Sequence, residues 1–142
     1  MAKTTVHKIK FDLEEDCMIL GISSGFADYR MAWEINNCLD VQLMLSEESI
    51  EVFDKKNSST HSFRVHNFFL EETQTSFYLI RNKQFHTYLV PERPQIDYYF
   101  FIRELHEINL EEIIMKLRTV NGITAVFDLS NEYIDAIDFL TF

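Results

Sequence analysis

Two carboxylates, Glu92 and Asp97, are attached to the most rigid stretch of the chain, because Pro91 and Pro94 fix the backbone around them. Five residues across a proline corner could bring the two groups within acid/base distance, where burial would raise the pKa of one of them. Alternatively, each carboxylate accepts hydrogen bonds from loop amides or pairs with an arginine. We favour this anchoring role, because an Asp at the junction of a turn and a strand commonly bonds backbone N–H groups.

A second candidate for chemistry is the run Gly21-Ile22-Ser23-Ser24-Gly25, which has the length and the central serine of a nucleophile elbow. A hydrolase would also need a histidine and a carboxylate near Ser23, and His66 and His86 are the histidines on predicted strands. An elbow expects a helix directly after the serine, whereas here further loop residues come before the predicted helix. The pattern therefore favours a plain strand and turn over a catalytic serine.

Metal and phosphate sites lack their usual spacings. His61 and His66 are five apart, which on a strand places them on opposite faces. Cys17 and Cys38 form no Cys-x-x-Cys pair, and three glycines do not build a phosphate loop. We therefore predict no metal and no cofactor, and we expect both cysteines to be buried, reduced thiols.

The net charge of the chain limits the classes of partner that it can bind. Lys and Arg number 13 against 23 Asp and Glu, a net charge of −10. Such a chain is repelled by nucleic acid and by anionic lipid unless it hides a basic face. The sequence also contains no apolar run near the roughly 20 residues that span a membrane. We expect a cytoplasmic protein that binds neither nucleic acid nor membrane.

The elements that hold the carboxylates are a corner and a strand. Pro91 and Pro94 push the residues before them out of the helical region, which predicts an extended corner. The run from Tyr98 to Ile102 is aromatic or β-branched throughout, and this is typical of a strand covered on both faces. Asp97 lies where corner and strand meet.

A helix is predicted from Asp28, which we expect to be its N-cap. Its apolar positions have helical spacing: Met31, Ile35, Cys38 and Leu39. Tyr29 and Trp33 lie four apart on an adjoining side, as a ligand wall or, the interpretation we favour, as core or subunit interface. We expect Arg30 to approach Glu92 or Asp97, with a solvated arginine as the alternative.

Residues 90–98, V-P-E-R-P-Q-I-D-Y, resemble the signature of the IPExxxVDY family of small bacterial proteins: Pro91, Glu92, Asp97 and Tyr98 match it, with Val90 for Ile and Ile96 for Val. The segment from Asp28 to Asn36 is similar to that family's tyrosine-arginine-apolar-alanine-tryptophan helix. The resemblance covers most of the chain. It implies a fold and brings no reaction, substrate or catalytic residue with it.

The remaining pattern predicts short strands joined by polar turns, which implies antiparallel neighbours. Asn109 and Glu112 have capping-box spacing before a second helix, which we expect to end at Gly122. Predicted strands cover residues 7–13, 17–22, 41–45, 50–53, 63–70, 77–80, 87–89, 98–102 and 123–128, and the apolar tail 131–142 is expected to dock on this chain or on a second copy. We expect residues 1–142 to form a single α+β domain, a largely antiparallel sheet of about six or seven strands with two main helices packed on one face.

Function is less constrained than fold. The missing catalytic patterns and the many aromatic residues favour a non-enzymatic protein-association module, acting as a homodimer or with another protein. The alternative is a small-molecule binding protein or an enzyme whose pocket lies near the 90–98 segment. Such a pocket would be lined by Tyr29, Trp33, Glu92, Asp97 and Tyr98.

Overall fold

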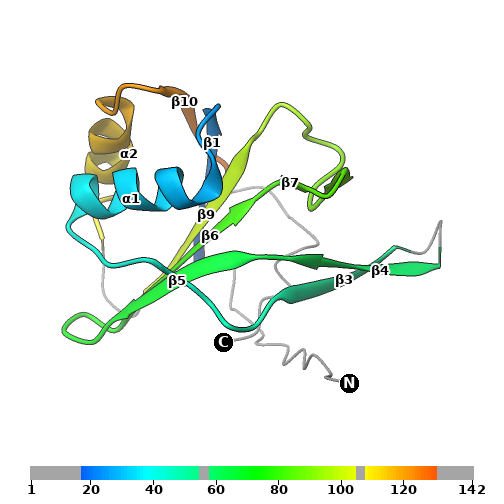
Figure 1. Ribbon diagram of the computed structural model, residues 1–142. Coiled ribbons are helices and arrows are strands. Elements are labelled where there is room, and N and C mark those ends of the chain that lie inside the picture. The colour runs from blue at the N-terminus through cyan, green and yellow to red at the C-terminus, as the bar shows by residue number, and fades with distance from the viewer. Residues whose placement is uncertain (1–16, 55–57, 105–107, 131–142) are drawn as a thin grey trace.

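The computed structural model describes residues 17–54, 58–104 and 108–130. Six strands form one antiparallel sheet in the order β10-β1-β9-β6-β5-β2, and two helices cover one of its faces (Figure 1). This confirms the predicted α+β class. The elements are β1 (Cys17–Ser24), α1 (Asp28–Leu39), β2 (Met44–Leu45), β3 (Ile50–Asp54), β4 (Ser59–Phe63), β5 (Val65–Leu70), β6 (Thr75–Arg81), β7 (Lys83–Gln84), β8 (Thr87–Tyr88), β9 (Tyr98–Arg103), α2 (Leu110–Arg118) and β10 (Ile123–Asp128).

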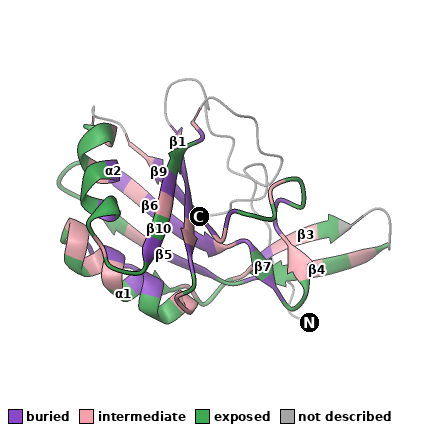
Figure 2. Cartoon of the chain, turned by 90° about the horizontal axis from the view of Figure 1, so that it is seen from above, coloured by how far each residue is buried: buried purple, intermediate pink, exposed green. Residues whose placement is uncertain are grey.

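Strand β9 lies inside the sheet, between β1 and β6, and its residues from Tyr98 to Ile102 are fully buried (Figure 2). Successive side chains point to opposite faces of a strand. Tyr98, Phe100 and Ile102 therefore pack under the helices, while Tyr99 and Phe101 pack on the other face. Burial on both faces of the sheet therefore explains the continuous apolar run, as predicted.

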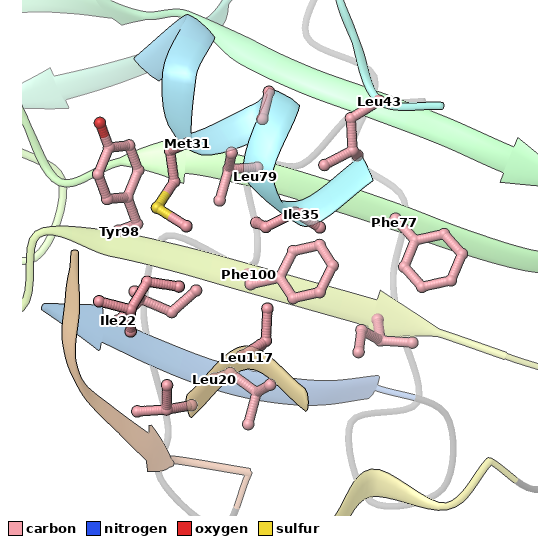
Figure 3. Close-up of a cluster of buried hydrophobic side chains, with 14 of the residues drawn as sticks. Leu20, Ile22, Met31, Ile35, Leu43, Phe77, Leu79, Tyr98, Phe100 and Leu117 are labelled. Atoms are coloured by element: carbon pink, nitrogen blue, oxygen red, sulfur yellow. The ribbon is translucent and has the colours of Figure 1, made fainter. Parts of the chain in front are cut away.

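The helix face forms one apolar cluster. Met31 and Ile35 of α1 and Leu117 of α2 pack onto Leu79 and Phe100 of the sheet (Figure 3). The opposite face is covered by the β3–β4 hairpin and by the proline corner, whose contributions are Ile50, Phe63, Leu89, Val90 and Ile96. The corner therefore covers part of the sheet face that lies opposite the helices.

Helix α1 begins at Asp28, but its N-cap is Ala27, so the prediction of Asp28 as N-cap was wrong by one residue. Asp28 lies instead in the first turn, where Oδ1 accepts the Tyr29 N–H at 2.8 Å and Oδ2 pairs with Arg64 at 3.0 Å. A carboxylate in the first turn is favourable because it faces the positive end of the helix dipole. The helix ends at Asp40 in the left-handed conformation, with φ of 58°.

Helix α2 has the predicted cap, since the Asn109 side chain accepts the Glu112 N–H at 3.1 Å. It stops at Arg118, four residues before the predicted stop at Gly122. Gly122, with φ of +109°, lies against the Phe26 ring, where a Cβ would come within 2.1 Å of a ring carbon. This glycine is required by a turn and a close ring contact.

Two predicted strands are shortened by side-chain amides that take the place of a neighbouring strand. The Asn36 side chain bonds both the N–H and the carbonyl of Leu43, so Leu43 needs no strand partner, and β2 is only Met44–Leu45. Gln84 does the same at Arg64, which divides the predicted 63–70 strand into β4 and β5. The predicted strand 7–13 and the docked tail 131–142 lie outside the described residues.

Candidate functional site

The proline corner is organised by Asn82, a fully buried side chain that follows β6. Its Nδ2 donates to the carbonyls of Arg93 at 3.0 Å and Ile96 at 2.9 Å. Its Oδ1 accepts the Val90 N–H at 2.8 Å. One amide therefore satisfies three backbone groups of the segment 90–96 and fixes its path.

The acid and tyrosine at the end of the corner bind the connection between β1 and α1. Asp97 Oδ2 accepts the Ser24 N–H at 2.8 Å. The Tyr98 hydroxyl donates to the Phe26 carbonyl, and burial raises the pKa of Tyr98 to about 12, although Arg81 acts in the opposite direction. Asp97 accepts a hydrogen bond from a backbone amide, as predicted, but the donor is the last residue of β1 and not a loop residue.

Glu92 occupies a different environment from Asp97. Together with Pro91 it is exposed on the outside of the corner, whereas the Asp97 carboxylate is turned to Ser24. A shared proton would need the two groups in contact inside one site. The geometry supports anchoring by Asp97 and a solvated Glu92.

Arg30 does not approach either carboxylate, which corrects the expectation drawn from the sequence. Its guanidinium pairs with Glu34 at 2.8 Å and lies 5.0 Å from the Phe26 ring centroid and 5.4 Å from that of Trp33. Glu34 is one turn along the same helix, so this pair forms without crossing to another element.

Tyr29 and Trp33 are surface residues, with exposed fractions of 73% and 56%. They do not belong to the core, which removes one of the roles favoured from their spacing. Together with Arg30, whose guanidinium lies over the Trp33 ring, they form an exposed strip of α1, here named the α1 ridge (Tyr29, Arg30 and Trp33).

Ser23 is part of the extended strand β1, which continues to Ser24, so no strained elbow forms at this serine. Its hydroxyl donates to the Gln95 carbonyl at 3.1 Å. Gly21 has a packing role, because a Cβ there would lie 2.8 Å from Leu129 and 2.9 Å from Ile96. The glycine-serine pattern is thus explained by the corner packing onto β1.

A half-open cleft of about 360 Å³ lies between the corner and β10. Arg118 also donates to the Val126 carbonyl at 2.7 Å within this region. The lining residues are Arg93, Gln95, Ile96, Arg118, Val126, Phe127, Asp128 and Leu129. None of the residues predicted for a pocket lines this cleft: Tyr29, Trp33, Glu92, Asp97 and Tyr98 lie elsewhere.

The β7–β8 hairpin is a feature that sequence reasoning missed. The turn is Phe85-His86, directly before the predicted strand 87–89, and both residues have positive φ, 54° and 67°. Left-handed backbone costs about 1–2 kcal/mol for a residue with a Cβ, and two-residue hairpin turns of this kind prefer Asn-Gly. No turn signal marks Phe85, which is 80% exposed.

Within ranges 17–54, 58–104 and 108–130, no three His, Cys, Asp or Glu side chains gather closely enough to hold a metal ion. Cys17 is buried and Cys38 half-buried, both are free thiols, and burial raises the pKa of Cys38. Neither described helix is long and apolar enough to cross a membrane. The chain matches no protein-family model and no curated protein.

Proposed function

We propose that the chain is a protein-association module and that the α1 ridge is its contact surface. The observation that carries this proposal is the exposure of Tyr29 and Trp33 together with Arg30, whose guanidinium lies over the Trp33 ring. Trp, Tyr and Arg are the residue types enriched at binding hot spots, because each combines a large contact area with a polar group. An exposed strip of these three types is unusual on a surface that only needs to be solvated.

The ridge is also held in place before any partner arrives. Arg30 is fixed by Glu34 and by the rings of Phe26 and Trp33. The helix below is secured by Met31 and Ile35, both fully buried. Binding then costs less side-chain entropy than it would for mobile side chains.

We take a second copy of the chain as the partner, because two-fold dimers are the commonest assemblies of soluble proteins. Trp33 is the only tryptophan, so its fluorescence reports on the ridge directly. On dimerisation its emission should shift to shorter wavelength as water leaves the indole. Sedimentation velocity over a concentration series should show the dimer at the same concentrations.

The decisive variant is Tyr29→Ala, which leaves the Trp33 signal in place. A hot-spot loss of about 2 kcal/mol corresponds to roughly 30-fold weaker dimerisation. Met115→Ala removes another exposed apolar side chain, on α2, and should leave dimerisation unchanged. A wild-type chain that stays monomeric at its highest soluble concentration, or equal effects of both variants, would refute the proposal.

A small-molecule function is a second candidate, favoured by the cleft beside the corner. Its volume of about 360 Å³ is near the lower end of ligand sites, and Arg93 and Arg118 make its lining cationic despite Asp128. The ligand class that fits is a small anion with an apolar part. Butyrate serves as the probe, and inorganic phosphate as an anion without an apolar part. Butyrate should raise the unfolding temperature of the wild type more than phosphate does, and should not raise that of Arg118→Gln; no shift with butyrate would remove this candidate.

A further inference from the structure

The β7–β8 hairpin presents an aromatic side chain at a strained turn. Phe85 and His86 both have left-handed backbone, a conformation that residues with a Cβ adopt only when their surroundings impose it. Phe85 is 80% exposed and so contributes little to the core. Asn-Gly would form this turn with less strain, so the hairpin gives Phe85 no structural reason to be there.

Hydrogen bonds at the base of the hairpin hold the strained turn in place. Gln84 is buried, and its side chain bonds both backbone groups of Arg64 and the Arg81 carbonyl at 2.8, 3.2 and 3.0 Å. Asn82 accepts the Leu89 N–H at 2.7 Å on the returning strand. Phe85 is therefore held out at a fixed position, as an anchor residue should be.

The hairpin has the opposite charge to the chain as a whole. No Asp or Glu occurs between Glu72 and Glu92, although the chain contains 23 of them. Arg81, Lys83 and His86 all belong to this stretch. A partner surface with apolar and acidic groups would complement it.

The α1 helix offers such a surface. Its ridge carries the exposed rings of Tyr29 and Trp33, and Asp40, the exposed C-cap, supplies a carboxylate at the end of the helix. Asp28, Glu34 and Asp40 against Arg30 and Arg64, which pair with Glu34 and Asp28, leave this surface acidic by one charge. Aromatic and acidic groups on one helix match the Phe85 tip and its basic neighbours.

In one copy, the base of the hairpin and the start of α1 lie close together, so that both can contact the same partner copy. Gln84 binds the Arg64 backbone, and the Arg64 side chain pairs with Asp28 at the start of α1. Figure 1 shows the first turn of α1 directed toward the side of the sheet from which the hairpin leaves. A two-fold axis beside Arg64 would bring the hairpin of each copy to the helix of the other.

We propose that in the dimer Phe85 of each copy packs on the α1 ridge of the other, with Lys83 and His86 facing the acidic groups of that helix. This inference rests on the proposed function and specifies how the two copies meet. The two contacts are identical by symmetry. Phe85 and Trp33 then touch across the interface and never within one chain.

That arrangement predicts coupling between two variants in different subunits. Trp33→Ala and Phe85→Ala each weaken their own homodimer. When they are mixed, one contact of the heterodimer keeps both Phe85 and Trp33, and the other lacks both. If the two side chains touch, the mixed dimer should be roughly threefold or more tighter than the geometric mean of the two homodimers, beyond the twofold statistical factor.

A second variant separates contact from folding. Phe85→Asn combined with His86→Gly relieves the turn, so its unfolding temperature should rise by roughly 2–4 °C or more while dimerisation weakens. A more stable variant with unchanged dimerisation overturns the inference, as does an additive result in the mixing experiment. If Tyr29→Ala weakens the dimer and both Phe85 variants do not, the α1 ridge is a contact surface to which the hairpin does not bind. A monomeric wild type refutes both the proposed function and this inference.

Discussion

Asp97 Oδ2 lies 2.8 Å from the Ser24 N–H and binds the end of the proline corner to the connection between β1 and α1. The two residues are 73 positions apart in sequence. The adjacent Tyr98 hydroxyl reaches the same connection at the Phe26 carbonyl. The acid-tyrosine pair therefore positions the start of α1, and with it the α1 ridge.

Removing the Asp97 carboxylate should destabilise the fold. Asp97→Ala leaves the Ser24 N–H without its charged acceptor, and hydrogen bonds to charged groups contribute about 1.5–3 kcal/mol. Asp97→Asn keeps an acceptor oxygen and should cost less. Urea denaturation measures both, and Glu92→Gln on the exposed side of the same corner is the control, expected within about 0.5 kcal/mol of wild type. Equal losses at the two positions would contradict the anchoring role.

Asn82→Ala should cost more than any change at Asp97. It leaves the Ile96 carbonyl and the Val90 N–H without partners in a buried site, where each orphaned group costs about 1–3 kcal/mol, and leaves the Arg93 carbonyl with the Ile96 N–H alone. We expect a total of at least about 3 kcal/mol, a large share of a typical folding free energy. Asn37→Ala, on the exposed side of α1, is the matched control and should be close to neutral. A mild effect of Asn82→Ala would mean that the corner holds its path without this amide.

Local signals predicted much of the fold. The apolar run from Tyr98 to Ile102 identified the central strand, and the Asn109 cap placed the start of α2. Both depend on residues adjacent in sequence. That Asp97 binds a backbone amide was also expected from its place at a strand junction, although the amide belongs to the end of β1 and not to a loop.

What could not be predicted depends on groups brought together by folding. Asn is a residue type common in turns. Asn82 becomes a buried anchor only because folding brings to it the carbonyls of residues 11 and 14 positions later in the chain. Asn36 and Gln84 replace strand partners by the same principle, so strand limits at Leu43 and Arg64 carry no signal in the sequence. Arg30 and Glu34 lie four apart on one helix, so their spacing is itself a signal for the pair that the structure shows.

The two glycines of the Gly21–Gly25 pattern should respond differently to alanine. At Gly21 a Cβ would lie 2.8 Å from Leu129 and 2.9 Å from Ile96, whereas at Gly25 nothing lies within 4 Å. Overpacking of this kind costs about 1–3 kcal/mol, moderated here because both neighbours are side-chain ends. Gly21→Ala should therefore lower the unfolding temperature and Gly25→Ala should not. A similar loss at both positions would indicate a constraint on the loop that packing does not explain.

His66 should make the stability of the fold depend on pH in the weakly acidic range. It is buried on β5, and desolvation lowers its pKa below the ordinary 6.5, with Asp28 acting in the opposite direction and Arg64 in the same one. Between the two pKa values the unfolded chain binds a proton that the folded chain does not, so stability rises with pH there. The contribution is complete above about pH 6.5 and is lost as the pH falls through the lower, folded-state pKa. Urea denaturation at about pH 7.5 and about pH 5.5 should show this loss for wild type and for His61→Gln, which keeps His66, and a smaller loss for His66→Gln. If His66→Gln loses as much stability on acidification as the wild type, the dependence arises from other groups, and burial of a neutral His66 is not its cause.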